Sequence, residues 1–129
     1  MARPQIILAL DSGALVRAEK NQRVEAIVRK WLREGARLLI PAPAIAESIR
    51  GGPKDAAANR LIKAVNHVAN TSESICRDAG VRLGSAASAA TIDAIIVATA
   101  EAYLATDILT TDSDDIRRLA GGHLNVIAL

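Results

Sequence analysis

Four acidic residues, far apart in the sequence, occupy positions that suit a shared metal-binding site. Asp11 and Asp112 each come directly after an apolar or β-branched run, IILAL and ILTT. Glu47 and Asp93 interrupt the otherwise apolar stretches PAPAIAES and TIDAIIVA. A carboxylate among apolar side chains is energetically costly unless a positive charge meets it. The four positions therefore indicate an acidic site that a cation completes.

The residue types in this set favour a hard, oxygen-binding ion. Carboxylates without a Cys or His cluster select Mg²⁺ or Mn²⁺ rather than Zn²⁺. The two histidines, His67 and His123, have no close spacing to a pair of acids. A magnesium ion held by a few carboxylates keeps several of its waters, which suits hydrolysis of a phosphodiester bond.

Each of these acids also has a simpler explanation when it is considered alone. Asp93 and Asp114 can complement the dipole at the N-terminus of a helix. Asp11 can simply end a strand, and Glu47 can be a solvated helix residue. We favour a site because an apolar strand pattern ends abruptly in acid twice, and because the other two acids lie within apolar stretches.

The chain alternates between strand patterns and helix patterns. Continuous apolar runs predict buried strands at 6–10, 38–40 and 108–111, and weaker patterns predict short strands near 68 and at 125–129. Apolar residues at helical spacing predict helices through 24–32, through 46–49, over about 54–66, from 71 or 72, from 91 to 104 and from 113 to 120.

The two helices nearest the later acids have expected caps and faces. Thr91 and Ser113 are the predicted N-caps, because a hydroxyl can accept a hydrogen bond from the first turn. Helical spacing predicts that Ile92, Ile95 and Ile96, with Tyr103 or Leu104, face the core.

We therefore expect an α/β fold, a single domain over residues 1–129 with a central, mainly parallel sheet flanked by helices. In an open parallel sheet, the carboxyl ends of the strands and the first turns of the following helices lie at one edge. The four acids would meet at that edge.

Composition narrows the class of protein. The chain has 129 residues, half of them hydrophobic, and its only aromatic side chains apart from histidine are Trp31 and Tyr103, so recognition by base stacking is disfavoured. Sixteen Lys and Arg face 14 Asp and Glu, and 12 of the 16 are arginine, which suits phosphate contact but equally an ordinary solvated surface. Cys76 is the single cysteine and no run approaches a membrane span, so we expect a cytoplasmic protein without a disulfide or a membrane segment.

The four acid-bearing segments together resemble the PIN-domain ribonucleases. LALDSGALV, PAPAIAES, TIDAIIVATA and ILTTDSDDIRRL occur in the family's order over essentially the whole chain, and the VapC toxins of bacterial toxin–antitoxin pairs are the most similar. The resemblance implies that the catalytic acids are Asp11, Glu47, Asp93 and Asp112. Asp114 matches a frequent fifth acid, with Asp115 as a competing candidate.

The resemblance also implies an activity and partners. It implies Mg²⁺- or Mn²⁺-dependent endonucleolytic cleavage of RNA, a cognate VapB-like antitoxin that inhibits it, and frequent homodimers. In this interpretation the metal is held by Asp11, Asp93, Asp112 and Asp114, and Glu47 is a further ligand or orients a water. Thr110 and Ser12 would support the site, while Gly13 departs from the Ser or Asn common in the family.

Four basic residues follow the segments that carry the first two acids: Arg17, Lys20, Arg50 and Lys54. Two interpretations stay open for them, contact with the RNA backbone and an ordinary solvated surface.

Other protein classes that place Asp after parallel strands fit less well. Receiver domains and haloacid-dehalogenase-type phosphatases need a late lysine near the phosphoryl group, but the last lysine here is Lys63. The phosphatases also need an acid two residues after the first, where this chain has Gly13. A PIN-like binding module that acts on nucleic acid or protein without catalysis remains the alternative.

Overall fold

The computed structural model describes residues 5–18 and 22–129, which form one parallel sheet covered by helices. The strand order is β3-β2-β1-β4-β5, and every neighbouring pair is parallel. The strands are β1 (Ile7–Leu10), β2 (Arg37–Pro41), β3 (His67–Ala69), β4 (Asp107–Thr110) and β5 (Asn125–Ala128). The predicted α/β fold with a parallel sheet is confirmed.

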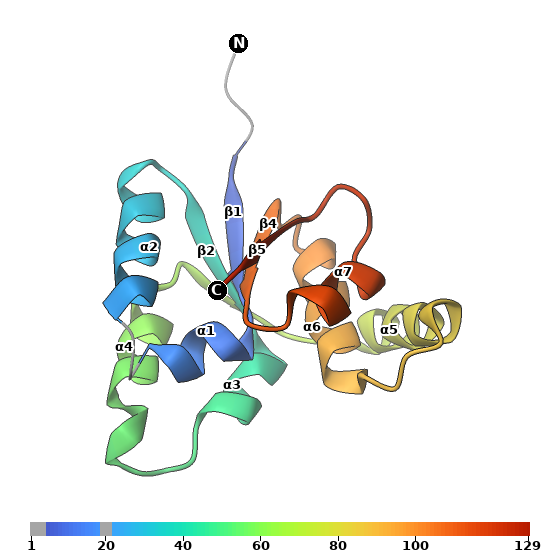
Figure 1. Ribbon diagram of the computed structural model, residues 1–129, viewed down its shortest axis with the longest axis horizontal. Helices are drawn as coiled ribbons and strands as arrows, with labels where there is room; N and C mark the ends of the chain where they lie inside the picture. The colour runs from blue at the N-terminus through green and yellow to red at the C-terminus, as the bar shows by residue number, and fades with distance from the viewer. Residues whose placement is uncertain (1–4, 19–21) are drawn as a thin grey trace.

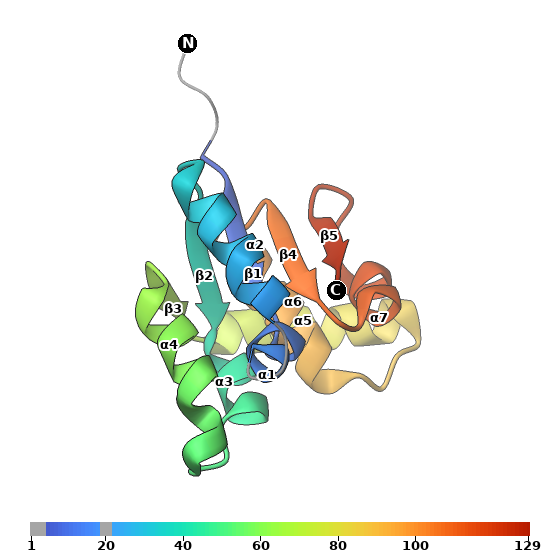
Figure 2. The same ribbon diagram turned by 60° about the vertical axis from the view of Figure 1, so that its left-hand side comes forward.

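Helices lie on both faces of this sheet (Figures 1 and 2). Figure 2 shows α2 and α1 in front of the strands, with α6 and α5 behind them. The helices are α1 (Ser12–Arg17), α2 (Gln22–Arg33), α3 (Ala42–Ser48), α4 (Ala56–Ala64), α5 (Glu73–Ala86), α6 (Thr91–Ala102) and α7 (Ser113–Leu119), with a 3₁₀ turn at Pro53–Asp55. None of them is long and apolar enough to cross a membrane.

The central strands are largely apolar because helices cover both of their faces. Leu8, Ala9 and Leu10 of β1 are fully buried, as are Ile108 and Leu109 of β4. Burying a side chain of this size contributes about 1.5–3 kcal/mol relative to leaving it exposed. This pair of strands is therefore the rigid centre of the fold.

The chain changes direction across the sheet between these two strands. From β1 it runs outward through β2 to β3, and it then returns to place β4 and β5 on the other side of β1. From the carboxyl ends of β1 and β4, at the lower edge of the sheet in Figure 1, the chain therefore continues to strands on opposite sides of this central pair. Ligands of open α/β sheets bind at such a switch point.

Two predicted helix caps were wrong by one residue, and some predicted core-facing side chains of α6 are exposed. The N-caps are Ala90 and Asp112 rather than Thr91 and Ser113, which are the first residues of their helices. Ile92 is 40% exposed, against the prediction that it faces the core, and so are both alternatives at the end of this face, Tyr103 at 38% and Leu104 at 75%. Helix α6 is buried between the sheet and α5 on most of its sides, so its apolar pattern does not define a single face.

Two other differences concern short elements. The α1 helix was missed because six residues starting directly after a strand give too few periodic positions to be recognised. The helix predicted over 54–66 begins with the 3₁₀ turn and is α-helical only over Ala56–Ala64.

Candidate metal centre

The four predicted acids lie together at the carboxyl edge of the sheet. Asp11 directly follows β1 and is the N-cap of α1, and Asp112 is the N-cap of α7 after β4. Asp93 lies in the first turn of α6, and Glu47 in the last turn of α3. Their burial is graded, because Asp11 is buried, Asp93 is half-buried, and Glu47 and Asp112 are exposed. The site is thus open to solvent on one side.

Carboxylate oxygens in this cluster form two groups that share one residue. Oxygens of Asp11, Glu47 and Asp93 lie within 4.8 Å of one another, and so do oxygens of Asp93, Asp112 and Asp115. Both groups consist only of oxygen donors, the ligands that Mg²⁺ and Mn²⁺ prefer. The residues present therefore fit a hard divalent cation, with Asp93 available to either group.

The fifth acid in this geometry is Asp115, and Asp114 belongs to neither group. The side chain of Asp114 is 89% exposed and its Oδ1 lies 3.7 Å from Arg117, whereas the Asp115 side chain is 39% exposed. Successive residues of an α-helix point about 100° apart, so these two cannot face the same centre. The geometry favours Asp115 over the Asp114 assignment.

Two hydroxyl groups fix the orientation of the acids. The Thr110 hydroxyl donates to Asp11 Oδ2 at 2.6 Å and accepts from the Asp112 backbone N–H at 2.9 Å. The Ser12 N–H donates to Asp11 Oδ1 at 2.7 Å, and the Ser12 hydroxyl donates to Glu47 Oε1 at 2.9 Å. Thr110 therefore joins the loops after β1 and β4, and Ser12 joins the first loop to α3.

Burial and mutual repulsion oppose ionisation of the central acids. Burial, the charge of Asp11 and the neighbouring Asp112 and Glu47 raise the pKa of Asp93 from 3.8 to about 7. Burial also raises the pKa of Asp11, although the hydrogen bonds from Thr110 and Ser12 partly oppose this effect. A cation in this cluster would relieve both effects.

These shifts predict how the stability of the metal-free protein depends on pH. A carboxyl whose pKa is raised on folding stabilises the folded state while it is protonated, and this contribution is lost as the pH rises from about 4 to about 7. In EDTA the melting temperature should therefore fall over this range, and Mn²⁺ should raise it most at the upper end. Thermal melts at pH 4 to 8 measure this, and a melting temperature that rises steadily to pH 8 in EDTA would contradict it.

Gly13, the departure from the family pattern, has a structural reason. A Cβ at this position would lie 2.1 Å from the Thr111 Oγ1 and 2.9 Å from its Cβ. Both residues adjoin acids of the cluster, Gly13 in the first turn of α1 and Thr111 in the loop after β4. The close approach of α1 to this loop therefore requires glycine at position 13, a constraint that local sequence patterns do not reveal because the contact joins distant segments.

Replacing Gly13 with serine should accordingly destabilise the protein by about 1–3 kcal/mol, the usual cost of overpacking. The matched control is Gly52→Ser, because nothing lies within 4 Å of a Cβ at that position. Chemical denaturation measures both variants, and Thr111→Gly in the same chain should recover part of the loss. A Gly13→Ser protein as stable as the control would show that α1 and the loop after β4 separate at no cost.

The match to a known family covers this whole arrangement. The family model of the PIN domain matches residues 8–122, a range that includes all five clustered acids. The chain belongs to the PIN domain family. No curated protein matches this PIN domain.

Solved structures share the fold of this PIN domain at low sequence identity. FitAB bound to an IR36 DNA fragment is 17% identical over 94% of both chains, with a TM-score of 0.65. VapBC2 from Rickettsia felis, bound to a DNA fragment from its promoter, is 13% identical over 96% of this chain and 99% of that chain, with a TM-score of 0.73. FitAcB from Neisseria gonorrhoeae is 18% identical over 93% and 96%, with a TM-score of 0.61.

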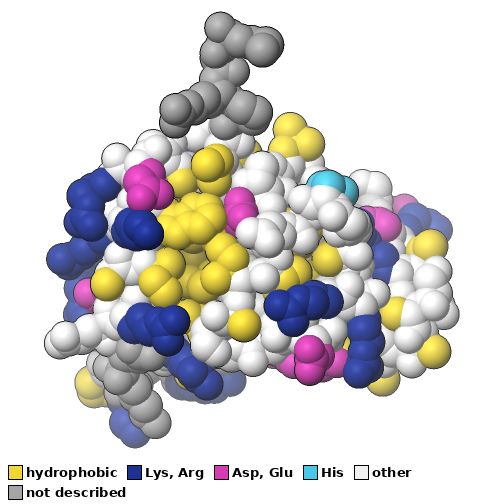
Figure 3. Space-filling model, turned by 45° about the horizontal axis from the view of Figure 1, so that its top comes forward, with side chains coloured by type: hydrophobic (Ala, Val, Ile, Leu, Met, Phe, Trp, Pro, Cys, Tyr) yellow, Lys and Arg dark blue, Asp and Glu magenta, His cyan; other side chains and the backbone are white. Residues whose placement is uncertain are grey.

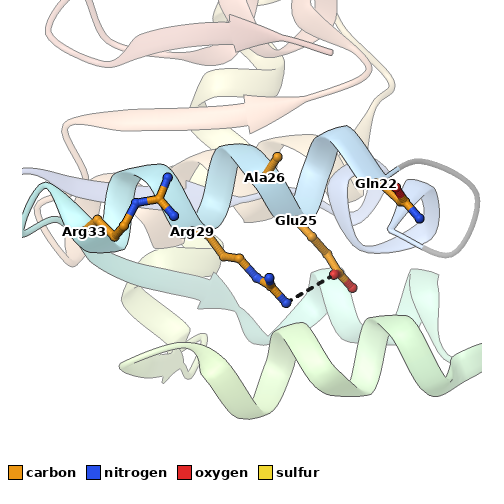
Figure 4. A pocket seen from close by; sticks show the side chains of 5 residues that line it. All are labelled: Gln22, Glu25, Ala26, Arg29 and Arg33. Carbon is orange, nitrogen blue, oxygen red and sulfur yellow. Dashed lines mark ion pairs between the residues drawn. The ribbon is translucent and has the colours of Figure 1, made fainter.

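One hollow on the surface of the PIN domain lies away from the clustered acids, and another borders them. A hollow of about 500 Å³ runs along one stripe of α2, as Figure 4 shows, and is lined by Gln22, Glu25, Ala26, Arg29 and Arg33. It includes none of the clustered acids. A cleft of about 240 Å³ borders the metal centre through Glu47 and is lined by Leu15, Val16, Glu47, Ser48, Arg50, Lys54, Asp55 and Ala58.

The predicted RNA contacts are divided between this cleft and other surfaces. Arg50 and Lys54 line the cleft, Arg17 is exposed at the end of α1, and Lys20 lies outside the described residues. Buried Asp55, which the sequence did not single out, accepts hydrogen bonds from the backbone N–H groups of Arg50 and Gly51 at 3.1 and 2.7 Å. Asp55 therefore fixes the loop that carries the cleft's basic residues.

Proposed function

We propose that this PIN domain is a metal-dependent endoribonuclease of the VapC toxin type. The observation that carries the proposal is the pair of carboxylate groups that share Asp93, held at the sheet's switch point by Thr110 and Ser12. The proposed ligands are Asp11, Asp93, Asp112 and Asp115, and Glu47 is a further ligand or orients a water. A bound Mg²⁺ or Mn²⁺ would supply water activation and charge stabilisation for phosphodiester hydrolysis.

The chain's own residues would prepare this site before substrate arrives. The Thr110 hydroxyl and the Ser12 N–H keep the Asp11 carboxylate aimed at the centre with two hydrogen bonds, so no reorientation is needed on binding. Glu47 and Asp112, the exposed members, are the acids that a substrate phosphate and its attacking water can reach.

The cleft beside Glu47 is the proposed path of the RNA backbone. Arg50 and Lys54 would contact phosphates there, and Arg17 and Lys20 would extend the basic surface. The Arg50 guanidinium already donates to the carbonyls of Ala46 and Ile49 at 3.0 and 2.9 Å, so Lys54 is the freer cation of the cleft. A Lys54→Gln protein whose cleavage rate had the same salt dependence as wild type would exclude this contact.

A protein partner is part of the proposal. The structural neighbours include FitAB and VapBC complexes, and by analogy we propose a cognate VapB-like antitoxin and a homodimer for this chain. Figure 3, which turns the edge opposite the metal centre toward the viewer, shows an apolar patch bordered by Lys and Arg side chains. Patches of this kind are typical of surfaces that a partner covers.

The decisive experiment compares two neighbouring acids. Asp115→Asn should reduce Mn²⁺-dependent cleavage of a mixed structured-RNA pool by about 100-fold, the order expected when a group that stabilises the transition state is removed. Asp114→Asn, one residue away and exposed, should stay within about twofold of wild type. EDTA should abolish cleavage in every sample.

Each result that differs from these expected activities would lead to a different conclusion. Loss of activity in Asp114→Asn alone would reverse the assignment of the fifth acid. Absence of cleavage in wild type, with Mn²⁺-dependent thermal stabilisation retained, would favour a binding module without catalysis. Absence of both would exclude the metal site.

A further inference from the structure

Glu101 carries a further buried carboxylate, remote from the metal centre. It lies in the last turn of α6, and its side chain is only 6% exposed. Its Oε1 accepts a hydrogen bond from the Gly121 N–H at 3.1 Å and lies 3.0 Å from His123 Nε2, and its Oε2 pairs with Arg82 of α5. A carboxylate this buried is stable only because these groups surround it.

Arg82 joins three helices through one guanidinium. Its Nη1 donates both to Glu101 and to the carbonyl of Leu119, the last residue of α7, at 2.9 Å. Its Nε donates to Asp78 of its own helix at 3.1 Å. Arg82 therefore ties the C-terminal ends of α6 and α7 to each other and to α5.

The opposite ends of the same two helices carry one of the carboxylate groups. Asp93 is in the first turn of α6, Asp112 caps α7, and Asp115 is in its first turn. At 1.5 Å per residue, Asp93 is about 12 Å from Glu101 along α6. The three acids repel one another at one end, and the Arg82–Glu101 pair holds the helices together at the other.

The position of α5 indicates that bracing is its main role. Figure 1 shows α5 on the side of α6 that faces away from the sheet, and its principal contacts are with α6 and α7. The Arg82–Glu101 pair, here called the clamp, makes no contact with the acids of the other group, because Asp11 follows β1 and caps α1 and Glu47 belongs to α3.

We propose that Arg82 and Glu101 are positioning residues that set the spacing of Asp93, Asp112 and Asp115 for a divalent ion. This inference rests on the proposed metal site and adds a remote determinant of its affinity. Without the clamp, α7 can pivot on its apolar contacts and move Asp112 and Asp115 relative to Asp93. The Asp11 side of the site stays in place.

Gly121, in the loop after α7, also supports the role of Glu101 in positioning α7. A Cβ at this position would lie 2.6 Å from Glu101 Oε1, so a side chain on residue 121 would displace the carboxylate from its present position. The loop and the C-terminal end of α7 thus depend on Glu101 together.

The test measures Mn²⁺ affinity directly, by calorimetric titration of the full chain. Arg82→Met and Glu101→Gln should each weaken Mn²⁺ binding by about fivefold, within the range typical of remote residues that couple to a site. Arg82→Lys, which keeps the charge opposite Glu101, should recover part of the affinity. The matched control is Arg77→Met on the same helix, whose ion pair with Glu73 is exposed.

A second control separates positioning from general loss of stability. Val24→Ala opens a cavity in α2, whose Val24 is fully buried, and should lower the melting temperature without changing Mn²⁺ affinity. If Arg82→Met does not fold, Glu101→Gln and Arg82→Lys carry the comparison. Clamp variants that bind Mn²⁺ as tightly as Arg77→Met would overturn the inference, as would Val24→Ala losing affinity in proportion to its melting temperature.

The same titration separates this inference from the proposed function. If the wild-type protein binds Mn²⁺ but cleaves no RNA, the proposed nuclease activity is refuted. The role of Arg82 and Glu101 is then still tested by the Mn²⁺ affinities of their variants. Wild type that binds no Mn²⁺ would overturn both.

Discussion

Asp93→Asn should abolish metal-dependent RNA cleavage and yet make the metal-free protein more stable at pH 8. Asp93 is shared by both carboxylate groups, so its loss removes a ligand from each. We expect cleavage at saturating Mn²⁺ to fall by at least about 100-fold. Mn²⁺ affinity, measured by titration, should fall with it.

The gain in stability has a separate physical reason. At pH 8 the wild-type carboxylate is ionised among other acids, against a pKa raised to about 7, whereas asparagine is neutral at every pH. In EDTA the variant should therefore melt above wild type at pH 8 and close to it at pH 4. Asp114→Asn is the control, because its exposed side chain belongs to neither group. An Asp93→Asn protein that cleaves within tenfold of wild type would contradict the shared-ligand role.

Thr110→Val should weaken both folding and metal binding, because one hydroxyl serves two loops. The substitution keeps the β-branched shape that suits β4 but leaves the Asp112 N–H without its acceptor and removes the 2.6 Å donor to Asp11. Losing such a buried partner costs about 1–3 kcal/mol, which chemical denaturation would show. Mn²⁺ affinity should fall about 10-fold, as when a group that orients a metal ligand is lost.

Thr110→Ser distinguishes loss of the hydroxyl from loss of packing. Serine keeps the hydroxyl and loses only a methyl group, so most of the Mn²⁺ affinity should return. Thr111→Val, at the next and exposed position, is the matched control for the substitution itself. Equal Mn²⁺ affinity in Thr110→Val and Thr111→Val would show that Asp11 keeps its orientation without this hydrogen bond.

The order of strands and helices was largely readable from local patterns. The continuous runs at Ile7–Leu10 and in β4 are readable because strands buried on both faces are mostly apolar, and the one fully buried polar side chain of β4, Thr110, is hydrogen-bonded. The same runs locate Asp11 and Asp112, since the first acid after such a strand must lie at its carboxyl end. Parallel pairing, which follows from alternating strands and helices, then predicts that these acids converge with Glu47 and Asp93.

Contacts between segments far apart in the chain decided the rest. Whether Asp114 or Asp115 faces the metal centre depends on how α7 is rotated against α6, which its packing sets and its own sequence does not. The fit of Gly13 against Thr111 and the Arg82–Glu101 clamp also join residues about 20 to 100 positions apart, and neither leaves a periodic signal. The sequence by itself therefore indicated the four candidate acids and a hard divalent cation as their proposed partner, because both inferences follow from residue type and local pattern. Only the tertiary structure showed that Asp115, and not Asp114, lies beside Asp93 and Asp112, because this depends on the rotation and spacing of packed helices.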